Sequence, residues 1–131
     1  MIRILVVEDN ALVAKFYRIA LERAGGYQVT CSEDVEFILA QVEAAAFDLL
    51  ILDVSLRNSR YQGRMIDGLE LAQLIRHTAA GKKLPILLAT AHAMEGDRQR
   101  LLTASGASAY IEKPIYDPNI LISKIQSLLT P

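Results

Sequence analysis

The sequence predicts an α/β fold built on a parallel sheet that helices cover on both faces. Short runs of branched apolar residues alternate along the chain with segments of helical apolar spacing. The central run, 49–52, is apolar at every position between Asp48 and Asp53, which is typical of a strand buried on both faces. Strands and helices that alternate in this way join by right-handed crossovers into one parallel sheet.

Five segments have the character of strands, because each is short and rich in branched or small apolar residues. They are 2–7, 27–31, 49–53, 85–89 and 107–111. Between the last two strands, residues 95–105 show the weakest helical pattern in the chain, with Gly96 near the start and a largely polar face. Residues 57–64 are polar without an apolar period, so we expect a loop there.

The other helices are predicted from their capping residues. Asn10, Asp34 and Asp117 can each cap a helix, and Asp67 with Glu70 resembles a capping box. The apolar positions expected to face the core are Leu12, Val13, Phe16, Ile19 and Ala20 in the first helix, Val35, Ile38, Leu39 and Val42 in the second, Leu69, Ala72, Leu74 and Ile75 in the third, and Ile120, Leu121, Ile125, Leu128 and Leu129 in the last.

Length and composition limit the class of protein. We expect residues 1–131 to form one domain, because 131 residues suffice for a core but not for two domains. Lys and Arg number 14 against 15 Asp and Glu, which gives no electrostatic reason to expect direct nucleic-acid binding. No membrane span or signal peptide is recognisable, so we expect a cytoplasmic protein. Cys31 is the single cysteine, which excludes an internal disulfide and a cysteine-based zinc site.

Polar residues close four of the five predicted strands. Glu8 and Asp9 follow the first strand, Asp53 ends the third, Thr90 follows the fourth, and Lys113 comes after the fifth. Parallel strands bring these residues to one edge of the sheet, where ligand sites form. Three carboxylates repel one another without a cation, and an oxygen-only set suits Mg²⁺. Asp53 could then attack a phosphoryl group, while Lys113 and Thr90 contact the phosphoryl oxygens.

With these residues, the chain resembles the receiver domain of two-component response regulators over essentially its whole length. The resemblance rests on Glu8 and Asp9, on Asp53, on Thr90 and on Lys113 followed by Pro114; Tyr110 matches the family's switch aromatic. It implies a flavodoxin-like (βα)5 fold, a doubly wound five-stranded parallel sheet in the order 2-1-3-4-5.

The resemblance also implies a role for each residue. Asp53 would accept the phosphoryl group from a sensor histidine kinase or a phosphotransfer protein. Asp9, Asp53 and the backbone carbonyl of Ser55 would bind Mg²⁺, with Glu8 acting through a water, and Lys113 would pair with the phosphoryl oxygens.

Two further residues would form the switch that the resemblance implies. Thr90 would move toward the phosphate, and Tyr110 would turn inward. The surface of the fourth helix, fifth strand and fifth helix would then change for a downstream protein effector, or for a homodimer through the same face. Such a protein is not an enzyme beyond its own phosphorylation and dephosphorylation.

Two features depart from the family's common pattern, and the end of the chain bears on whether the receiver stands alone. Residues 57–64 lengthen the usual short turn between the phosphoacceptor and Gly68, and we hypothesise that Arg57, Arg60 and Arg64 recognise an acidic partner surface. Ser55 and His92 occupy positions that vary in the family and tune phosphoryl lifetime. The chain ends just past the last helix, so we expect a stand-alone receiver unless an effector domain has been removed.

Two alternatives from other classes stay open. A phosphohydrolase with an aspartyl-phosphate intermediate would use a similar sheet, but such enzymes typically need a second acid two residues after the nucleophile, where Ser55 stands. A phosphorylation-independent binding module would be expected to have lost some of the five site residues, and none is lost.

Overall fold

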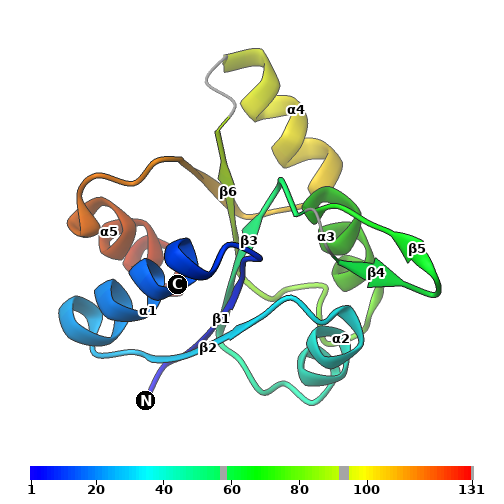
Figure 1. The fold of residues 1–131 in the computed structure, drawn as a ribbon, viewed down its shortest axis with the longest axis horizontal. Helices are drawn as coiled ribbons and strands as arrows, with labels where there is room; N and C mark the ends of the chain where they lie inside the picture. The colour runs from blue at the N-terminus through cyan, green and yellow to red at the C-terminus, as the bar shows by residue number, and fades with distance from the viewer. Residues whose placement is uncertain (57–58, 92–94, 131) are drawn as a thin grey trace.

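The computed structural model describes residues 1–56, 59–91 and 95–130, and its centre is a parallel sheet of five strands (Figure 1). In spatial order the strands are β2 (Gln28–Ser32), β1 (Arg3–Val7), β3 (Leu49–Asp53), β6 (Ile86–Thr90) and β7 (Ala109–Glu112). β6 and β7 are the fourth and fifth strands of this sheet along the chain. The order is therefore the 2-1-3-4-5 of a doubly wound sheet, which confirms the predicted fold class.

The helices cover both faces of the sheet. Figure 1 shows α1 (Ala11–Gly25) and α5 (Pro118–Leu129) on one side, and α2 (Val35–Glu43) and α3 (Gly68–His77) on the other. α4 (Glu95–Ser105) belongs to the second side, because its Leu101 packs against the same apolar cluster as α2 and α3.

Two apolar cores lie on the two faces, and successive strand residues alternate between them. Ile4 and Val6 of β1 join the core under α1 and α5, whereas Leu5 and Val7 join the core under α2 and α3. This alternation follows from the two-residue period of a strand. It explains why the central strands are apolar at every position: both faces of each strand are covered.

The predicted helix starts are confirmed by capping contacts. The Asn10 side chain accepts hydrogen bonds from the backbone N–H groups of Leu12 and Val13, at 3.0 and 3.2 Å. Asp67 and Glu70 form a complete capping box at the start of α3. Asp34 and Asp117 cap α2 and α5.

Several predicted core positions are wrong. In α1, Leu12 and Ile19 are exposed, and the buried side is formed by Tyr17, Ala20 and Leu21. In α5, Ile120 is exposed and Ile122 is buried in its place. In α3, Leu71 is buried although it was not among the predicted core positions. These helices hold more apolar residues than one face can bury. Apolar spacing alone therefore predicts a buried stripe that is displaced by about one position from the observed one.

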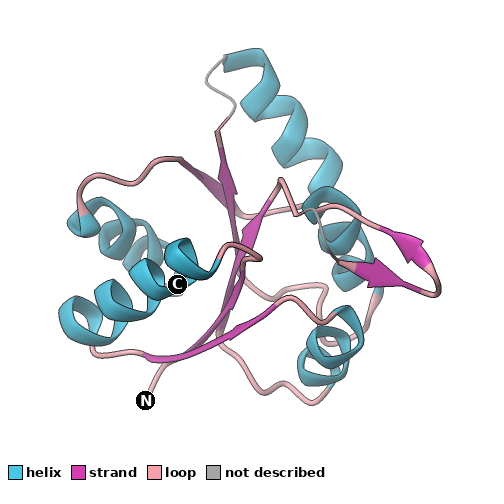
Figure 2. Ribbon diagram, in the orientation of Figure 1, coloured by secondary structure: helices cyan, strands magenta, loops and turns pink. Residues whose placement is uncertain are grey.

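The segment expected to be a loop is also different in part. β4 (Arg60–Tyr61) pairs antiparallel with β5 (Arg64–Met65), and Figure 2 shows this pair standing apart from the main sheet. Gln62 and Gly63 both have positive φ, as the tightest hairpin turns require. Strands of two residues are too short to show a pattern, which is why the hairpin was not predicted.

The hairpin is tied to the body of the protein. Tyr61 packs against the core under α2 and α3, and the Ser59 hydroxyl donates a hydrogen bond to the carbonyl of Glu33 at 3.0 Å. Arg64 is paired with Glu70 at 2.8 Å. Arg57 lies outside the described residues, so the role proposed for the arginines of this segment stays a prediction.

Across residues 1–56, 59–91 and 95–130, none of the helices is both long enough and apolar enough to span a bilayer.

Candidate phosphoacceptor site

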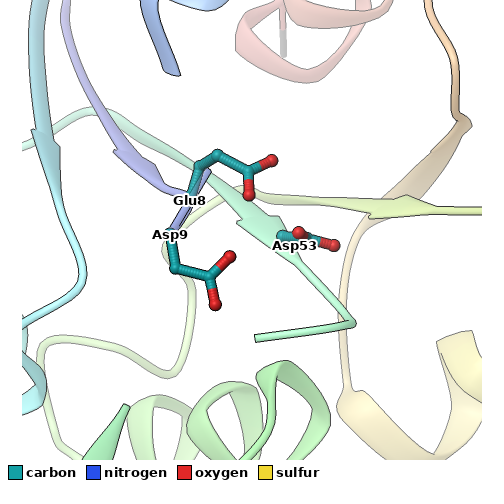
Figure 3. Close-up of side chains that lie close together, drawn as sticks. All are labelled: Glu8, Asp9 and Asp53. Atoms are coloured by element: carbon teal, nitrogen blue, oxygen red, sulfur yellow. The ribbon is translucent and has the colours of Figure 1, made fainter. Parts of the chain in front are cut away.

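Three carboxylates meet at the carboxyl ends of β1 and β3 (Figure 3). Glu8 and Asp9 follow β1 directly, and Asp53 is the last residue of β3, the strand that pairs with β1. One oxygen from each carboxylate lies within 4.8 Å of the others. The parallel pairing of the two strands is what brings residues 44 positions apart into one cluster, as the sequence predicted.

Glu8 and Asp53 are nearly inaccessible to solvent, at 6% and 4% exposure, whereas Asp9 is half-buried. Burial raises the pKa of Glu8, and the neighbouring Asp53 carboxylate raises it further; the backbone N–H of Asn10 and the charge of Lys113 oppose this. Two buried like charges therefore destabilise each other here. An oxygen-only set with excess negative charge has the donor chemistry that a hard divalent cation requires, so these residues fit Mg²⁺.

Lys113 brings a positive charge to this cluster. Its Nζ lies 3.1 Å from Oδ2 of Asp53 and 3.4 Å from Oε1 of Glu8. The lysine follows β7, and its backbone N–H donates to the carbonyl of Thr90 at 2.9 Å, which extends the pairing of β6 with β7 by one residue. Lys113 is thus held beside Asp53 by the sheet.

The backbone after Asp53 is closely packed. The N–H of Ser55 donates to Oδ1 of Asp53 at 3.0 Å, and the N–H of Gly68 donates to the carbonyl of Val54 at 3.0 Å. A Cβ at Gly68 would lie only 1.9 Å from the backbone oxygen of Asp53. In the sequence, Gly68 served only to mark the end of the lengthened loop, and its steric role was not predicted. A glycine at the first position of a capped helix was the feature that could have indicated this role.

Thr90 and Tyr110 lie on the two strands beyond Asp53. Thr90 ends β6 and is almost fully buried, one residue after the position that pairs with Asp53. Tyr110, in β7, is half-buried, with its ring between Arg98 of α4 and Lys124 of α5. The switch roles of both residues stay predictions, as does the Ser55 carbonyl as a metal ligand. His92 lies outside the described residues.

Comparison with known proteins agrees with this geometry. Residues 4–126 match the family model of the response regulator receiver domain. The chain belongs to the response regulator receiver family. It is therefore a receiver domain of two-component signalling, as the resemblance predicted.

Relatives of this receiver include proteins of different lengths. It is 31% identical to the polar-differentiation response regulator DivK of Brucella anthropi over 126 residues, which cover 96% of this chain and 94% of DivK. It is 32% identical to the phosphate regulon transcriptional regulatory protein PhoB of Klebsiella pneumoniae over 127 residues, which cover 97% of this chain and 51% of PhoB. The chain thus spans about half of PhoB and nearly all of DivK.

A solved structure resembles this receiver closely. It is the receiver domain of the sensor histidine kinase PA1611 from Pseudomonas aeruginosa PAO1, which was solved with a magnesium ion coordinated in its active-site cleft. The two share 30% sequence identity with a TM-score of 0.79, over 97% of this chain and 96% of that one.

An apolar cavity of about 450 Å³ adjoins the acid cluster on the α1 side of the receiver. Lys113 lines this cavity and also contacts Asp53 of the cluster. Leu12, Val13 and Phe16 line it from α1. Tyr17 also lines it, and within the described residues its buried hydroxyl has no hydrogen-bond partner. Burial raises the pKa of Tyr17, as do the charges of Glu8 and Asp53.

Proposed function

We propose that this receiver accepts a phosphoryl group on Asp53, in a Mg²⁺-dependent reaction, from a sensor histidine kinase or a phosphotransfer protein. One observation supports the proposal above the others. The Asp53 carboxylate is buried at the end of a central strand, 3.1 Å from the Lys113 ammonium and clustered with Glu8 and Asp9. A carboxylate placed in this way combines a nucleophile with the charges that stabilise a developing phosphate.

The metal would be held by Asp9, Asp53 and the Ser55 carbonyl, with Glu8 reaching it through a water. When bound, it would offset the negative charge of the cluster and of the phosphoryl oxygens. The magnesium in the PA1611 receiver supports this assignment. Because the pKa of Glu8 is raised, protons compete with the metal for this carboxylate, so we expect Mg²⁺ affinity to fall as the pH is lowered.

The chain's own residues supply the nucleophile and the polar contacts of the transfer. An oxygen of Asp53 forms a bond to phosphorus, while the bond from phosphorus to the donor's histidine nitrogen breaks and the nitrogen keeps the electron pair. The Lys113 ammonium, already 3.1 Å from Asp53, pairs with an equatorial oxygen, and the Thr90 hydroxyl donates to another. The product is an aspartyl phosphate, so this receiver catalyses only its own phosphorylation and dephosphorylation.

Phosphorylation would then change the face formed by α4, β7 and α5. Thr90 moves toward the phosphate and Tyr110 turns inward, and the altered face binds a downstream protein effector or a second copy of the receiver. The position of Lys113 supports this coupling, because it contacts Asp53 and directly follows β7.

The test is incubation with acetyl phosphate, with Mg²⁺ or with a chelator, followed by intact mass measurement. We expect one added phosphoryl group, labile to alkali, only with Mg²⁺ and only when Asp53 is present. Asp53→Asn should abolish the adduct. Asp48→Asn is the matched control, because Asp48 precedes the same strand at its other end and pairs with Arg3. An adduct that persists in Asp53→Asn, or no adduct from either acetyl phosphate or a histidine kinase, would refute the proposal.

A further inference from the structure

Arg98 of α4 contacts Tyr110 and Glu112 of β7. Its Cζ lies 5.4 Å from the centre of the Tyr110 ring, and its Nη1 donates to the Tyr110 hydroxyl at 3.5 Å. Nη2 of the same guanidinium pairs with the Glu112 carboxylate. From the other side, Nζ of Lys124 lies 5.0 Å from the ring centre. Two cations therefore attract the electron-rich ring of Tyr110 into the space between α4 and α5.

Arg98 is also a principal link between α4 and the sheet. Among the side chains described for α4, Ser105 alone is buried, with Leu101 and Leu102 half-buried in the second half of the helix. In the first half, the Arg98 side chain is 17% exposed and reaches β7. A groove of about 460 Å³, lined by Arg98, Tyr110 and Lys124, lies beside these contacts. Polar contacts, rather than close apolar packing, hold the start of α4 on β7.

These contacts lie next to the phosphoacceptor site. Glu112 stands opposite Thr90 in the pairing of β6 with β7. The next residue, Lys113, contacts Asp53. A change of charge on Asp53 acts on Lys113 and Thr90, which are the immediate neighbours of the carboxylate that Arg98 binds.

We propose that Arg98 is a positioning residue that holds Tyr110 between α4 and α5 and thereby opposes the switch. An inward turn of Tyr110 breaks the contacts of its ring and hydroxyl with Arg98, so these contacts stabilise only the unphosphorylated arrangement. Removing them shifts the population toward the switched arrangement before any phosphoryl group is added. The inference rests on the proposed function, because it requires Asp53 to drive the switch.

The experiment compares Arg98→Met, which keeps a long apolar stem, with Arg98→Lys, which keeps the charge. Arg100→Met is the matched control: it removes the same charge from the same helix, where Arg100 is exposed and pairs with Asp97. Each protein is prepared with 3-fluorotyrosine, and the Tyr110 signal among the five tyrosines is assigned with Tyr110→Phe. Fluorine NMR spectra are recorded with Mg²⁺ during titration with beryllofluoride, a phosphoryl mimic.

Arg98→Met should move the Tyr110 signal of the beryllofluoride-free protein toward its position in the bound wild type. It should also tighten beryllofluoride binding by about 2- to 5-fold, the factor expected for a partly exposed cation–π contact that exists in one state only. Arg98→Lys should fall between Arg98→Met and wild type, and Arg100→Met should match wild type.

Two failures are distinguishable. If wild type and all variants ignore beryllofluoride, the proposed function fails at Asp53. If wild type binds beryllofluoride but Arg98→Met and Arg98→Lys match Arg100→Met in both signal and affinity, the inference about Arg98 is wrong while the proposed function stands. Thermal unfolding of each variant identifies any that fail to fold. If Arg98→Met is unfolded, the signal and affinity of Arg98→Lys decide whether Arg98 opposes the switch.

Discussion

α3 and α4 follow each other on the same face of the sheet, yet they are attached in opposite ways. α3 starts with a complete capping box and buries Gly68, Leu71, Ala72 and Ile75. In Figure 1 the end of α4 lies beside α3 while its start projects away from the other helices, and Ser105 is the buried member among its described side chains. Along the chain, α3 is the next helix after the strand that ends in Asp53, beyond the β4–β5 hairpin, and α4 follows the strand that ends in Thr90.

The difference fits the proposed function, in which one part of the site stays fixed and another moves. The proposed phosphoacceptor Asp53 would have to keep its geometry, and the helix behind it is anchored by close packing. The proposed switch would require two arrangements that differ by a small free energy, and the helix beyond Thr90 buries few of its described side chains. Matching substitutions in the two helices test this contrast.

The largest contrast is expected between the glycine of α3, Gly68, and the glycine of α4, Gly96. In Gly68→Ala the new Cβ would stand 1.9 Å from the Asp53 backbone oxygen, so the start of α3 has to shift. We expect the free energy of unfolding to fall by about 3 kcal/mol, the upper range for overpacking. Gly96→Ala meets no atom within 4 Å and should raise stability by up to about 1 kcal/mol through helix propensity. Urea unfolding measures both, and similar losses in the two variants would contradict the contrast.

An arginine in each helix gives the next contrast. Arg76 of α3 donates to the carbonyls of Gly81 and Leu84, both at 2.7 Å, and to that of Gly106 at 2.8 Å. It thereby joins the end of α3 to the loops before β6 and β7. Arg76→Met leaves these carbonyls without their charged donor, and we expect a loss of about 2–3 kcal/mol.

Arg100→Met is the counterpart in α4. Arg100 is exposed and pairs with Asp97, so its loss should cost no more than about 0.5 kcal/mol. Thermal unfolding of both variants decides the matter, and an Arg76→Met protein as stable as Arg100→Met would show that the loop carbonyls find other donors.

The sequence predicted the scaffold better than it predicted the surfaces of the helices. Strand positions and the strand-end residues follow from strong signals, because unbroken apolar runs and capping acids have few other interpretations. The side of α1 that is buried did not follow: Leu12 and Tyr17 both satisfy helical spacing, and tertiary packing selects Tyr17. The two-residue strands of the hairpin are likewise fixed by the positive φ angles of Gln62 and Gly63 and by packing of Tyr61.

The convergence of the acid cluster could be predicted because topology alone brings strand ends together. Its energetics could not, because the raised pKa of Glu8 depends on burial that appears only in three dimensions. The contacts of Arg98 could not be predicted for the same reason. It lies in the segment with the weakest helical pattern, and its partners Tyr110 and Glu112 are identified only when α4 is placed on β7.

The smallest contrast concerns an acid at the start of each helix, the N-cap residue Asp67 of α3 and Asp97 in the first turn of α4. Asp67 accepts from the N–H of Glu70 at 2.9 Å, and Glu70 accepts in return from the N–H of Asp67 at 3.3 Å. Asp67→Ala removes half of this capping box and should cost about 1 kcal/mol. Asp97→Ala in α4 removes only an exposed pair with Arg100 and should cost about 0.3–0.5 kcal/mol.

Because α3 begins against the backbone of Asp53, Asp67→Ala should also slow phosphorylation by acetyl phosphate, whereas Asp97→Ala should leave that rate at the wild-type value. If instead the two variants lose stability equally and both keep the wild-type rate, the anchoring of α3 is not what fixes the geometry of Asp53.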